Sequence, residues 1–208
     1  MAKARPPTFA IAQAAALPRP AVIVIGASAG GVETLLPMLA RLGPGAPPVV
    51  VVLHVRRDRP SLLANIFASA CAIPVSEAVD GEPLLPGTIA FAPPDYHLLL
   101  DRGPRLRLSL DPPLRFSRPS IDVLFESAAD VLGAGVLAIV LSGYNDDGTQ
   151  GAGTVVRAGG RVLVQDPDTA RGIQMPSAAL AGVPGASMVT PAVIADLLER
   201  FSSMTDHP

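Results

Sequence analysis

The chain of 208 residues has one cysteine, no tryptophan, and a single lysine, Lys3, beside 15 arginines. The lone cysteine, Cys71, excludes an internal disulfide and the C-x-x-C patterns of metal and redox sites, and it favours a reducing compartment, the cytoplasm. No apolar run reaches the roughly 18 residues that a membrane-spanning helix requires. The net charge of −2, with no basic stripe, is not typical of a nucleic-acid-binding protein.

The ends of the chain differ in composition from its centre. Residues 1–20 contain a weak, alanine-rich apolar stretch that Pro6 and Pro7 precede and Gln13 interrupts. A secretory signal would be cleaved directly against a buried strand, so we expect a disordered tail instead. Residues 21–201 are expected to form one domain, followed by a frayed end at 202–208.

Short apolar runs alternate with amphipathic segments through most of the chain. The expected strands are 21–25, 49–53, 136–141 and 161–165, and the expected helices are 30–42, 60–70, 120–132, 148–158, 176–181 and 191–201. Three short strands, at 88–92, 96–100 and 105–110, interrupt this order, and the last two are typical of a hairpin. The pattern predicts an α/β fold, a doubly wound, mostly parallel sheet flanked by helices on both faces, with a small antiparallel hairpin.

Polar residues follow the expected strands, where an open parallel sheet gathers its ligands. Ser28 lies in a glycine-rich turn between a strand and a helix, a place from which a serine hydroxyl can attack a carbonyl. His54 follows the next strand and has the side chain best suited to proton transfer near neutral pH. Asp146 and Asp147 follow a third strand, and either could orient the histidine. Together they predict a Ser-His-Asp hydrolase.

Each of these residues also has a simpler interpretation. Ser28 could cap a helix, His54 could be a hydrogen-bonded strand-end histidine, and the Asp-Asp-Gly run could be a turn. The glycine-rich turn could cradle a phosphate, but Ser28 replaces the second glycine of a dinucleotide fingerprint. Val32 and Glu33 replace the lysine and the hydroxyl residue of a P-loop. A nucleotide-binding domain is therefore the least favoured alternative.

With these residues in view, the sequence resembles the catalytic domain of the CheB-type chemotaxis-receptor methylesterases over about residues 22–198. The matching segments, in order, are Val24-Ile25-Gly26-Ala27-Ser28-Ala29-Gly30-Gly31, His54, Pro86-Gly87 to Ala92-Pro93, Tyr96-His97-Leu98, Arg118-Pro119-Ser120-Ile121-Asp122-Val123-Leu124-Phe125, Leu141-Ser142-Gly143, Asp147-Gly148, Gln165-Asp166 and Met175-Pro176. The resemblance implies Ser28 as nucleophile, His54 as base and Asp147, rather than Asp146, as the third member.

The resemblance also implies a site lining and an activity. Main-chain N–H groups near Ala29 and Tyr144 would hold the oxyanion, with Gly30 and Met175 also lining the site. The implied reaction is hydrolysis of glutamyl methyl esters on cytoplasmic signalling helices of chemotaxis receptors, and certain glutamines could be deamidated as well. No cofactor or metal is expected, and neither is a nucleic-acid partner or direct membrane insertion.

Regulation and partners are further expectations of the resemblance. Twenty residues before the first strand cannot contain the receiver domain that many family members carry, so we expect a free-standing esterase, open or gated by a separate regulatory protein. Arg56, Arg57 and Arg59 could meet an acidic receptor helix, although a solvated loop is equally consistent. His97 is expected to be structural or to form part of the site wall. The alternative function is a catalytically silent docking module of the same fold.

Overall fold

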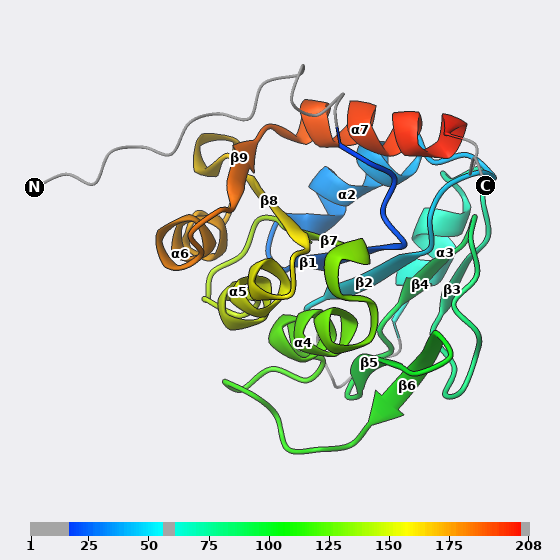
Figure 1. Ribbon diagram of the computed structural model, residues 1–208, viewed down its shortest axis with the longest axis horizontal. Coiled ribbons are helices and arrows are strands. Elements are labelled where there is room, and N and C mark those ends of the chain that lie inside the picture. Colours follow the sequence, from blue (N-terminus) through cyan, green and yellow to red (C-terminus); the bar gives the residue numbers. More distant parts are fainter. Residues whose placement is uncertain (1–16, 56–60, 205–208) are drawn as a thin grey trace, which may run out of the picture.

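The computed structural model describes residues 17–55 and 61–204, in which a parallel sheet lies between two layers of helices (Figure 1). Residues 1–16 of the tail expected at 1–20 lie outside this part, as do Arg56, Arg57, Arg59 and residues 205–208. Within the described part, Leu17 is buried in the core and its carbonyl accepts a hydrogen bond from Arg200. None of the described helices is both long and apolar enough to cross a membrane.

The main sheet contains seven strands in the order β3-β4-β2-β1-β7-β8-β9, and every pairing is parallel. Its strands are β1 (Val22–Ala27), β2 (Val49–Leu53), β3 (Val75–Glu77), β4 (Ile89–Phe91), β7 (Val136–Val140), β8 (Arg161–Gln165) and β9 (Ser187–Val189). A separate antiparallel hairpin is formed by β5 (His97–Asp101) and β6 (Arg105–Ser109). The predicted fold class, a parallel α/β sheet with a small hairpin, is confirmed.

Helices cover both faces of the sheet. One face carries α2 (Gly31–Leu39), α3 (Leu63–Ala68) and α7 (Pro191–Ser203), and the other carries α4 (Ile121–Leu132), α5 (Thr149–Arg157), α6 (Gln174–Gly182) and the hairpin. Short 3-10 turns occupy Gly133–Gly135 and Pro167–Thr169. The predicted first and last residues of most helices differ from these bounds by three residues or fewer.

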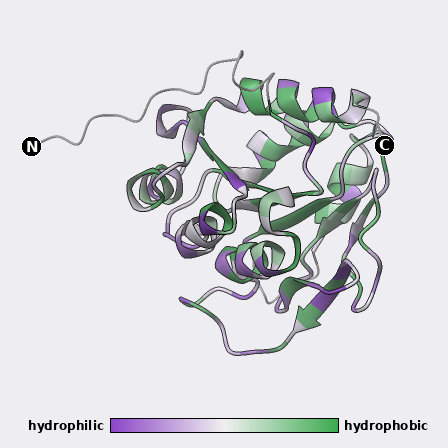
Figure 2. Ribbon diagram, viewed as in Figure 1, coloured by the Kyte–Doolittle hydropathy of each residue, from purple (hydrophilic) through white to green (hydrophobic). Residues whose placement is uncertain are grey.

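The side chains of the central strands point alternately to the two faces of the sheet, and each face has its own hydrophobic core. On β1, Ile23 and Ile25 pack against the α2 and α7 side, while Val22 and Val24 pack against the α4 side. Successive strand side chains point to opposite faces, so a continuous run of apolar residues fills both cores. The hydropathy colouring shows this arrangement, with hydrophobic strands inside and hydrophilic outer faces on the helices (Figure 2).

The strand order reverses its direction at β1. The chain moves from β1 to β2 on one side, and β7 later pairs with β1 on the other. A crevice forms at such a switch point, outside the carboxyl ends of the strands, because the connections leave in opposite directions. The residues that follow β1, β2 and β7 therefore lie together at this edge of the sheet.

Candidate active site

A tight turn carries Ser28 from the end of β1 into α2. The Ser28 backbone N–H donates to the carbonyl of Ser142 at 2.8 Å, and the Ser28 carbonyl accepts from Gly31 N–H at 2.8 Å. Gly30 adopts a φ of 81°, and a Cβ there would lie 2.7 Å from Cβ of Arg171. Glycine is required at this position, and the turn leaves the Ser28 side chain half-buried at the sheet edge.

Unused backbone donors lie beside Ser28. Among the residues that the structure describes, the N–H groups of Ala29 and Gly30 make no hydrogen bond. These groups immediately precede α2, whose own first N–H groups add to the positive end of the helix dipole. Such donors can stabilise negative charge that develops on a carbonyl oxygen next to Ser28.

His54 lies beside Ser28 because of the register between β1 and β2. Ala27 pairs with Leu53, and the backbone N–H of His54 donates to the Ala27 carbonyl at 3.0 Å. On the imidazole, Nε2 lies 2.9 Å from Oδ2 of Asp147. Because an ionised carboxylate can only accept, Nε2 carries the proton and Nδ1 is left as the basic nitrogen.

The Asp147 carboxylate is buried and fully hydrogen-bonded. Oδ2 accepts from His54 Nε2 at 2.9 Å and from Ile121 N–H at 2.8 Å, and Oδ1 accepts from the Ser120 hydroxyl at 2.9 Å and from Asp122 N–H at 3.0 Å. Burial raises the pKa of Asp147, but the hydrogen bonds from His54, Ile121 and Asp122 outweigh it, so the pKa lies below its ordinary value. Asp147 is therefore an anion held by the first turn of α4.

The strand register places Ser28 and His54 side by side along the backbone, and their side chains are not hydrogen-bonded to each other in this structure. Within residues 17–55 and 61–204, the Ser28 Oγ makes no hydrogen bond to His54 or to any other group. The ring is nevertheless oriented by Asp147 and by the end of β2. Hydrogen bonds between a nucleophile and its base are commonly long until substrate is bound.

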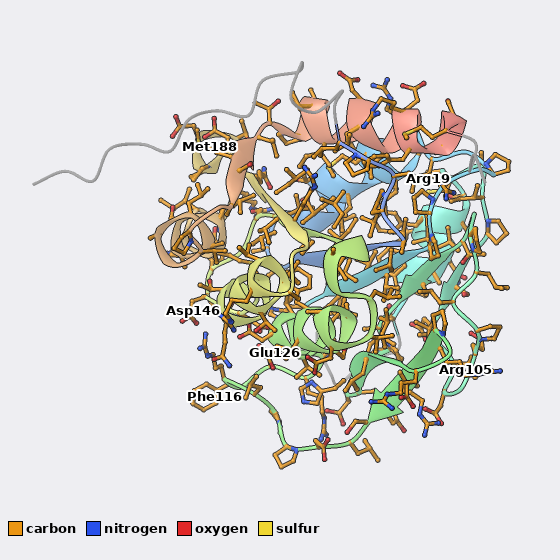
Figure 3. All side chains as sticks on the ribbon, in the orientation of Figure 1. Arg19, Arg105, Phe116, Glu126, Asp146 and Met188 are labelled. Atoms are coloured by element: carbon orange, nitrogen blue, oxygen red, sulfur yellow. The ribbon has the colours of Figure 1, made fainter. Side chains whose placement is uncertain are left out.

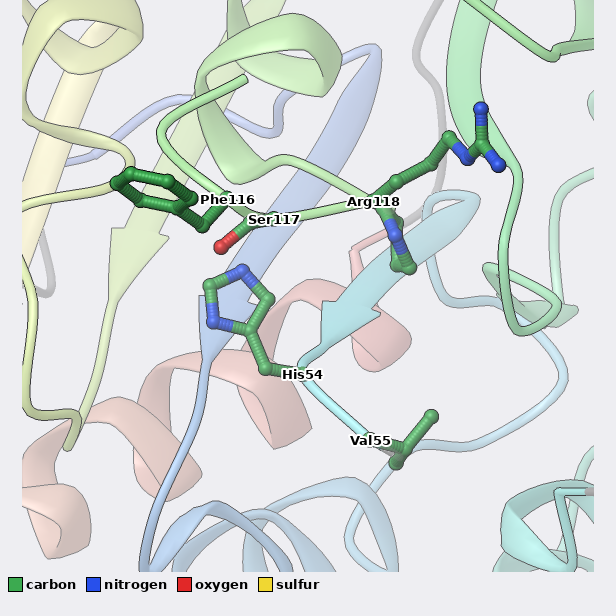
Figure 4. A pocket seen from close by; sticks show the side chains of 6 residues that line it. His54, Val55, Phe116, Ser117 and Arg118 are labelled. Carbon is green, nitrogen blue, oxygen red and sulfur yellow. The ribbon is translucent and has the colours of Figure 1, made fainter. Parts of the chain in front are cut away.

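A pocket of about 180 Å³ opens next to the imidazole. It is lined by His54, Val55, Phe116, Ser117, Arg118 and Pro119 (Figure 4). Figure 4 shows the Ser117 hydroxyl pointing toward the His54 ring, whereas Val55 points away from it. Phe116 is 98% exposed and projects from the molecule on the side where Asp146 lies (Figure 3). The pocket therefore has the His54 imidazole at one side and an apolar ring at its rim.

The arginine next to Phe116 connects the pocket wall to the aspartate loop. Arg115 Nη1 lies 3.0 Å from Oδ2 of Asp146 and 3.7 Å from Oδ2 of Asp122. Asp146 is largely exposed, so of the two adjacent aspartates only Asp147 reaches His54. The spacing of the sequence pattern left Asp146 and Asp147 open as partners of His54. In the structure, the Asp147 side chain is buried and contacts the imidazole, whereas that of Asp146 is exposed.

Asp122 is a buried carboxyl group that the sequence analysis did not single out. Its Oδ1 accepts from Gly151 N–H at 2.7 Å, while its Oδ2 has no hydrogen-bond partner. Burial, with a smaller contribution from the neighbouring Asp147 charge, raises the pKa of Asp122 to about 6 against the opposing effects of Gly151 and Arg115. Its position one residue into α4 was visible in the sequence, but its burial was not.

The remaining expected site residues occupy different environments. Tyr144 is exposed, and its hydroxyl donates to the Arg171 carbonyl at 3.3 Å. Met175 is fully buried and packs beneath Gly143, where a Cβ would lie 2.5 Å from its Cε. Met175 therefore supports the loop after β7 from below. In the described part of the chain, no group of three or more His, Cys, Asp or Glu side chains could hold a metal ion.

Ser142, which sequence reasoning gave no role, joins three loops of the site. Its hydroxyl donates to the Ala29 carbonyl at 2.6 Å and accepts from Gly172 N–H at 2.8 Å. Its own N–H donates to Oε1 of Gln165 at 2.9 Å. A buried serine directly after β7 was the available signal, since strand ends at a switch point position ligand-binding loops.

The family model for the CheB methylesterase matches residues 23–198 of the chain. This chain belongs to the CheB methylesterase family. The crystal structure of the Thermotoga maritima CheB methylesterase catalytic domain superposes with a TM-score of 0.82 at 30% identity, covering 89% of this chain and 99% of that one. The resemblance that the motifs indicated is thereby confirmed.

Curated relatives show the same similarity. A protein-glutamate methylesterase/protein-glutamine glutaminase of the group 3 operon of Bradyrhizobium diazoefficiens is 40% identical over 163 residues, which are 77% of this chain and 45% of that protein. A Rhodospirillum rubrum protein of the same name is 38% identical over 179 residues, 83% of this chain and 44% of that protein. The chain thus spans about half the length of these CheB relatives.

Proposed function

We propose that this chain is a serine hydrolase that removes methyl esters from glutamate side chains of proteins. The proposal rests on the hydrogen bond between His54 and the buried Asp147, which orients an imidazole beside a serine on a strand-to-helix turn. The CheB family match and the relatives named protein-glutamate methylesterase support the choice of ester. Ser28 is the nucleophile, His54 the base and Asp147 the group that fixes the tautomer of His54.

In the first half of the reaction, Ser28 Oγ attacks the γ-carbonyl carbon of the methyl ester. His54 Nδ1 takes the hydroxyl proton, and the carbonyl oxygen becomes an oxyanion held by N–H groups of Ala29 and Gly30. When the C–O bond to methoxide breaks, the imidazolium returns the proton to it, and methanol leaves. The γ-carbonyl is then esterified to Ser28. Each oxyanion donor contributes about 3–4 kcal/mol in related sites.

In the second half, water attacks the acyl-serine with the same residues. His54 Nδ1 takes a proton from water, hydroxide adds to the carbonyl, and the Ser28 alkoxide leaves with the proton that His54 returns. The products are free Ser28 and a glutamic acid side chain, which ionises. Asp147 stays ionised throughout and stabilises the imidazolium in both steps, in agreement with the direction of its pKa shift.

The same chemistry extends to an amide. A glutamine side chain would give the same acyl-serine, with His54 protonating ammonia as it leaves instead of methoxide. The names of the curated relatives include glutaminase activity. We propose methylated signalling helices of chemotaxis receptors as the substrates, with the reaction in the cytoplasm.

Methanol release from methylated receptor provides the test. Wild-type protein should release methanol, Ser28→Ala should reduce the rate by about 10⁴-fold or more, and a fluorophosphonate probe should label Ser28 in the wild type alone. Equal rates for wild type and Ser28→Ala, with no labelling of Ser28, would contradict the proposal and favour a silent docking module. Asp146→Asn, which alters an exposed carboxylate, is the matched control and should retain the wild-type rate.

A further inference from the structure

His97 is a buried histidine that the proposed reaction does not use. It begins β5, is only 2% exposed, and lies outside the pocket next to His54. Its Nδ1 lies 3.2 Å from the backbone nitrogen of Ser120, and its Nε2 lies 3.2 Å from the carbonyl oxygen of Pro112. Both ring nitrogens are therefore engaged with backbone groups.

These two partners determine the proton position on His97. The Ser120 N–H can only donate, so Nδ1 must be an unprotonated acceptor, and the Pro112 carbonyl can only accept, so Nε2 must carry the proton. The two contacts differ in exposure. Ser120 is completely buried, whereas Pro112 is exposed to water. Without the Nδ1 acceptor, the Ser120 N–H would be a buried donor without a partner, which is the costlier loss.

Ser120 connects this histidine to the proposed catalytic aspartate. It is the N-cap of α4, but its side chain makes no capping bond. Its hydroxyl instead donates to Oδ1 of Asp147, and the next two residues, Ile121 and Asp122, donate their backbone N–H groups to the same carboxylate. Three of the four donors to Asp147 thus come from the segment whose first backbone N–H is fixed by His97.

We propose that His97 is a positioning residue that sets the orientation of Asp147, and through it of His54, by holding the Ser120 backbone with Nδ1. It touches no substrate, and it acts on the turnover rate rather than on substrate binding. The inference rests on the proposed function, because it assigns a task to a residue within that mechanism. If His97 only packed in the core, losing either of its two hydrogen bonds would have the same effect. The positioning role predicts that only the bond to Ser120 N–H matters for turnover.

Two substitutions separate the two hydrogen bonds. In His97→Asn the side-chain oxygen replaces Nδ1 and can still accept from Ser120 N–H, while the bond to the Pro112 carbonyl is lost. In His97→Gln the amide nitrogen replaces Nε2 and can still donate to Pro112, while Ser120 N–H loses its acceptor. We expect kcat for methanol release to stay within about threefold of wild type in His97→Asn and to fall about 10- to 100-fold in His97→Gln, with KM unchanged in both.

Equal losses of kcat in the two variants, or a loss that appears in KM alone, would overturn the inference. Thermal unfolding and circular dichroism establish that each variant is folded at the assay temperature. If His97→Gln does not fold, a measurement on the wild-type protein replaces it. ¹⁵N NMR of histidine-labelled wild type should show His97 as the neutral Nε2–H tautomer at pH 7.5, and an Nδ1–H tautomer or an imidazolium would overturn the inference.

The same experiments separate this inference from the proposed function. If the wild-type protein and Ser28→Ala release methanol equally slowly, the esterase proposal fails whatever His97 does. If wild type is active and His97→Asn loses as much activity as His97→Gln, the esterase proposal stands and the positioning role is wrong. His97→Asn assigns the His97 signals in the ¹⁵N spectrum, because they are absent from that variant while the signals of His54 and His207 remain.

Discussion

Asp147 Oδ2 lies 2.9 Å from His54 Nε2, although 93 residues separate them in the chain. The aspartate is 1% exposed, so the hydrogen bond forms where water competes little. The direction of this bond decides which nitrogen acts as base, because it leaves Nδ1 of His54 for the neighbouring serine.

Asp147→Asn should lower kcat for methanol release by about 10³–10⁴-fold with little change in KM. Wherever the amide nitrogen is placed, it faces a backbone N–H of Ile121 or Asp122, and the imidazole loses the anion that fixes its tautomer. Asp146→Asn is the control and should change kcat less than about twofold, because Asp146 is exposed and pairs only at the surface. Similar losses in the two variants would contradict the assignment of Asp147.

Asp122→Asn should change the free energy of unfolding in a pH-dependent way. The pKa of Asp122 is raised to about 6 in the folded protein, and it is about 3.9 in an unfolded chain. The folded state therefore binds this proton more tightly, and the stability that Asp122 contributes falls as the pH rises from about 4 to 6 and is constant above that. The Asn side chain keeps the acceptor for Gly151 N–H and carries no charge.

The variant should match wild type near pH 4 and exceed its stability by about 1–3 kcal/mol at pH 8. Urea unfolding of both proteins at the two pH values measures this difference, and the contributions of all other titrating groups cancel. A difference that is the same at both pH values, or a variant that is less stable at pH 8, would show that Asp122 is ionised at no cost in the folded protein.

Ser142→Ala should lower both stability and turnover. The hydroxyl joins the Ala29 carbonyl to Gly172 N–H, so its loss leaves a buried donor unpaired and releases the turn beside Ser28. We expect a loss of about 1–3 kcal/mol in unfolding free energy, together with a kcat about tenfold lower. Ser202→Ala removes an acceptor for Gly43 N–H on α7, away from the site, and should lower stability alone. A kcat equal to that of wild type in Ser142→Ala would show that Ser142 does not contribute to turnover.

Phe116→Ala should weaken the binding of protein substrates specifically. The ring is 98% exposed at the rim of the pocket next to His54, where it can contact a helix that presents its ester to Ser28. We expect KM for methylated receptor to rise about 10-fold, in the range for loss of an exposed aromatic contact, with kcat on a small ester unchanged. Val79→Ala, an exposed apolar residue that does not line the pocket, is the control. An unchanged KM for receptor would exclude Phe116 from substrate contact.

Much of the fold could be predicted from local pattern alone. The strands β1 and β2 are continuous apolar runs, which predict a parallel sheet that is buried on both faces. Gly30 indicates the left-handed turn after the first strand. The edge strands β3 and β9 were not predicted. Each has three residues and pairs on one side only, so neither leaves a periodic signal.

The same distinction between local pattern and tertiary structure applies to the candidate site. The order of residues along the chain determined that Ser28, His54 and an aspartate follow strands of one parallel sheet, since such strands end at a common edge. The family resemblance favoured Asp147 over Asp146, whereas the spacing alone left both open. Only the tertiary structure shows that Asp147 contacts the imidazole, that the first turn of α4 supplies three of its four donors, and that His97 contacts the Ser120 backbone at that turn. Strand ends follow from local periodicity, whereas burial and hydrogen-bond partners depend on how elements far apart in the chain pack together.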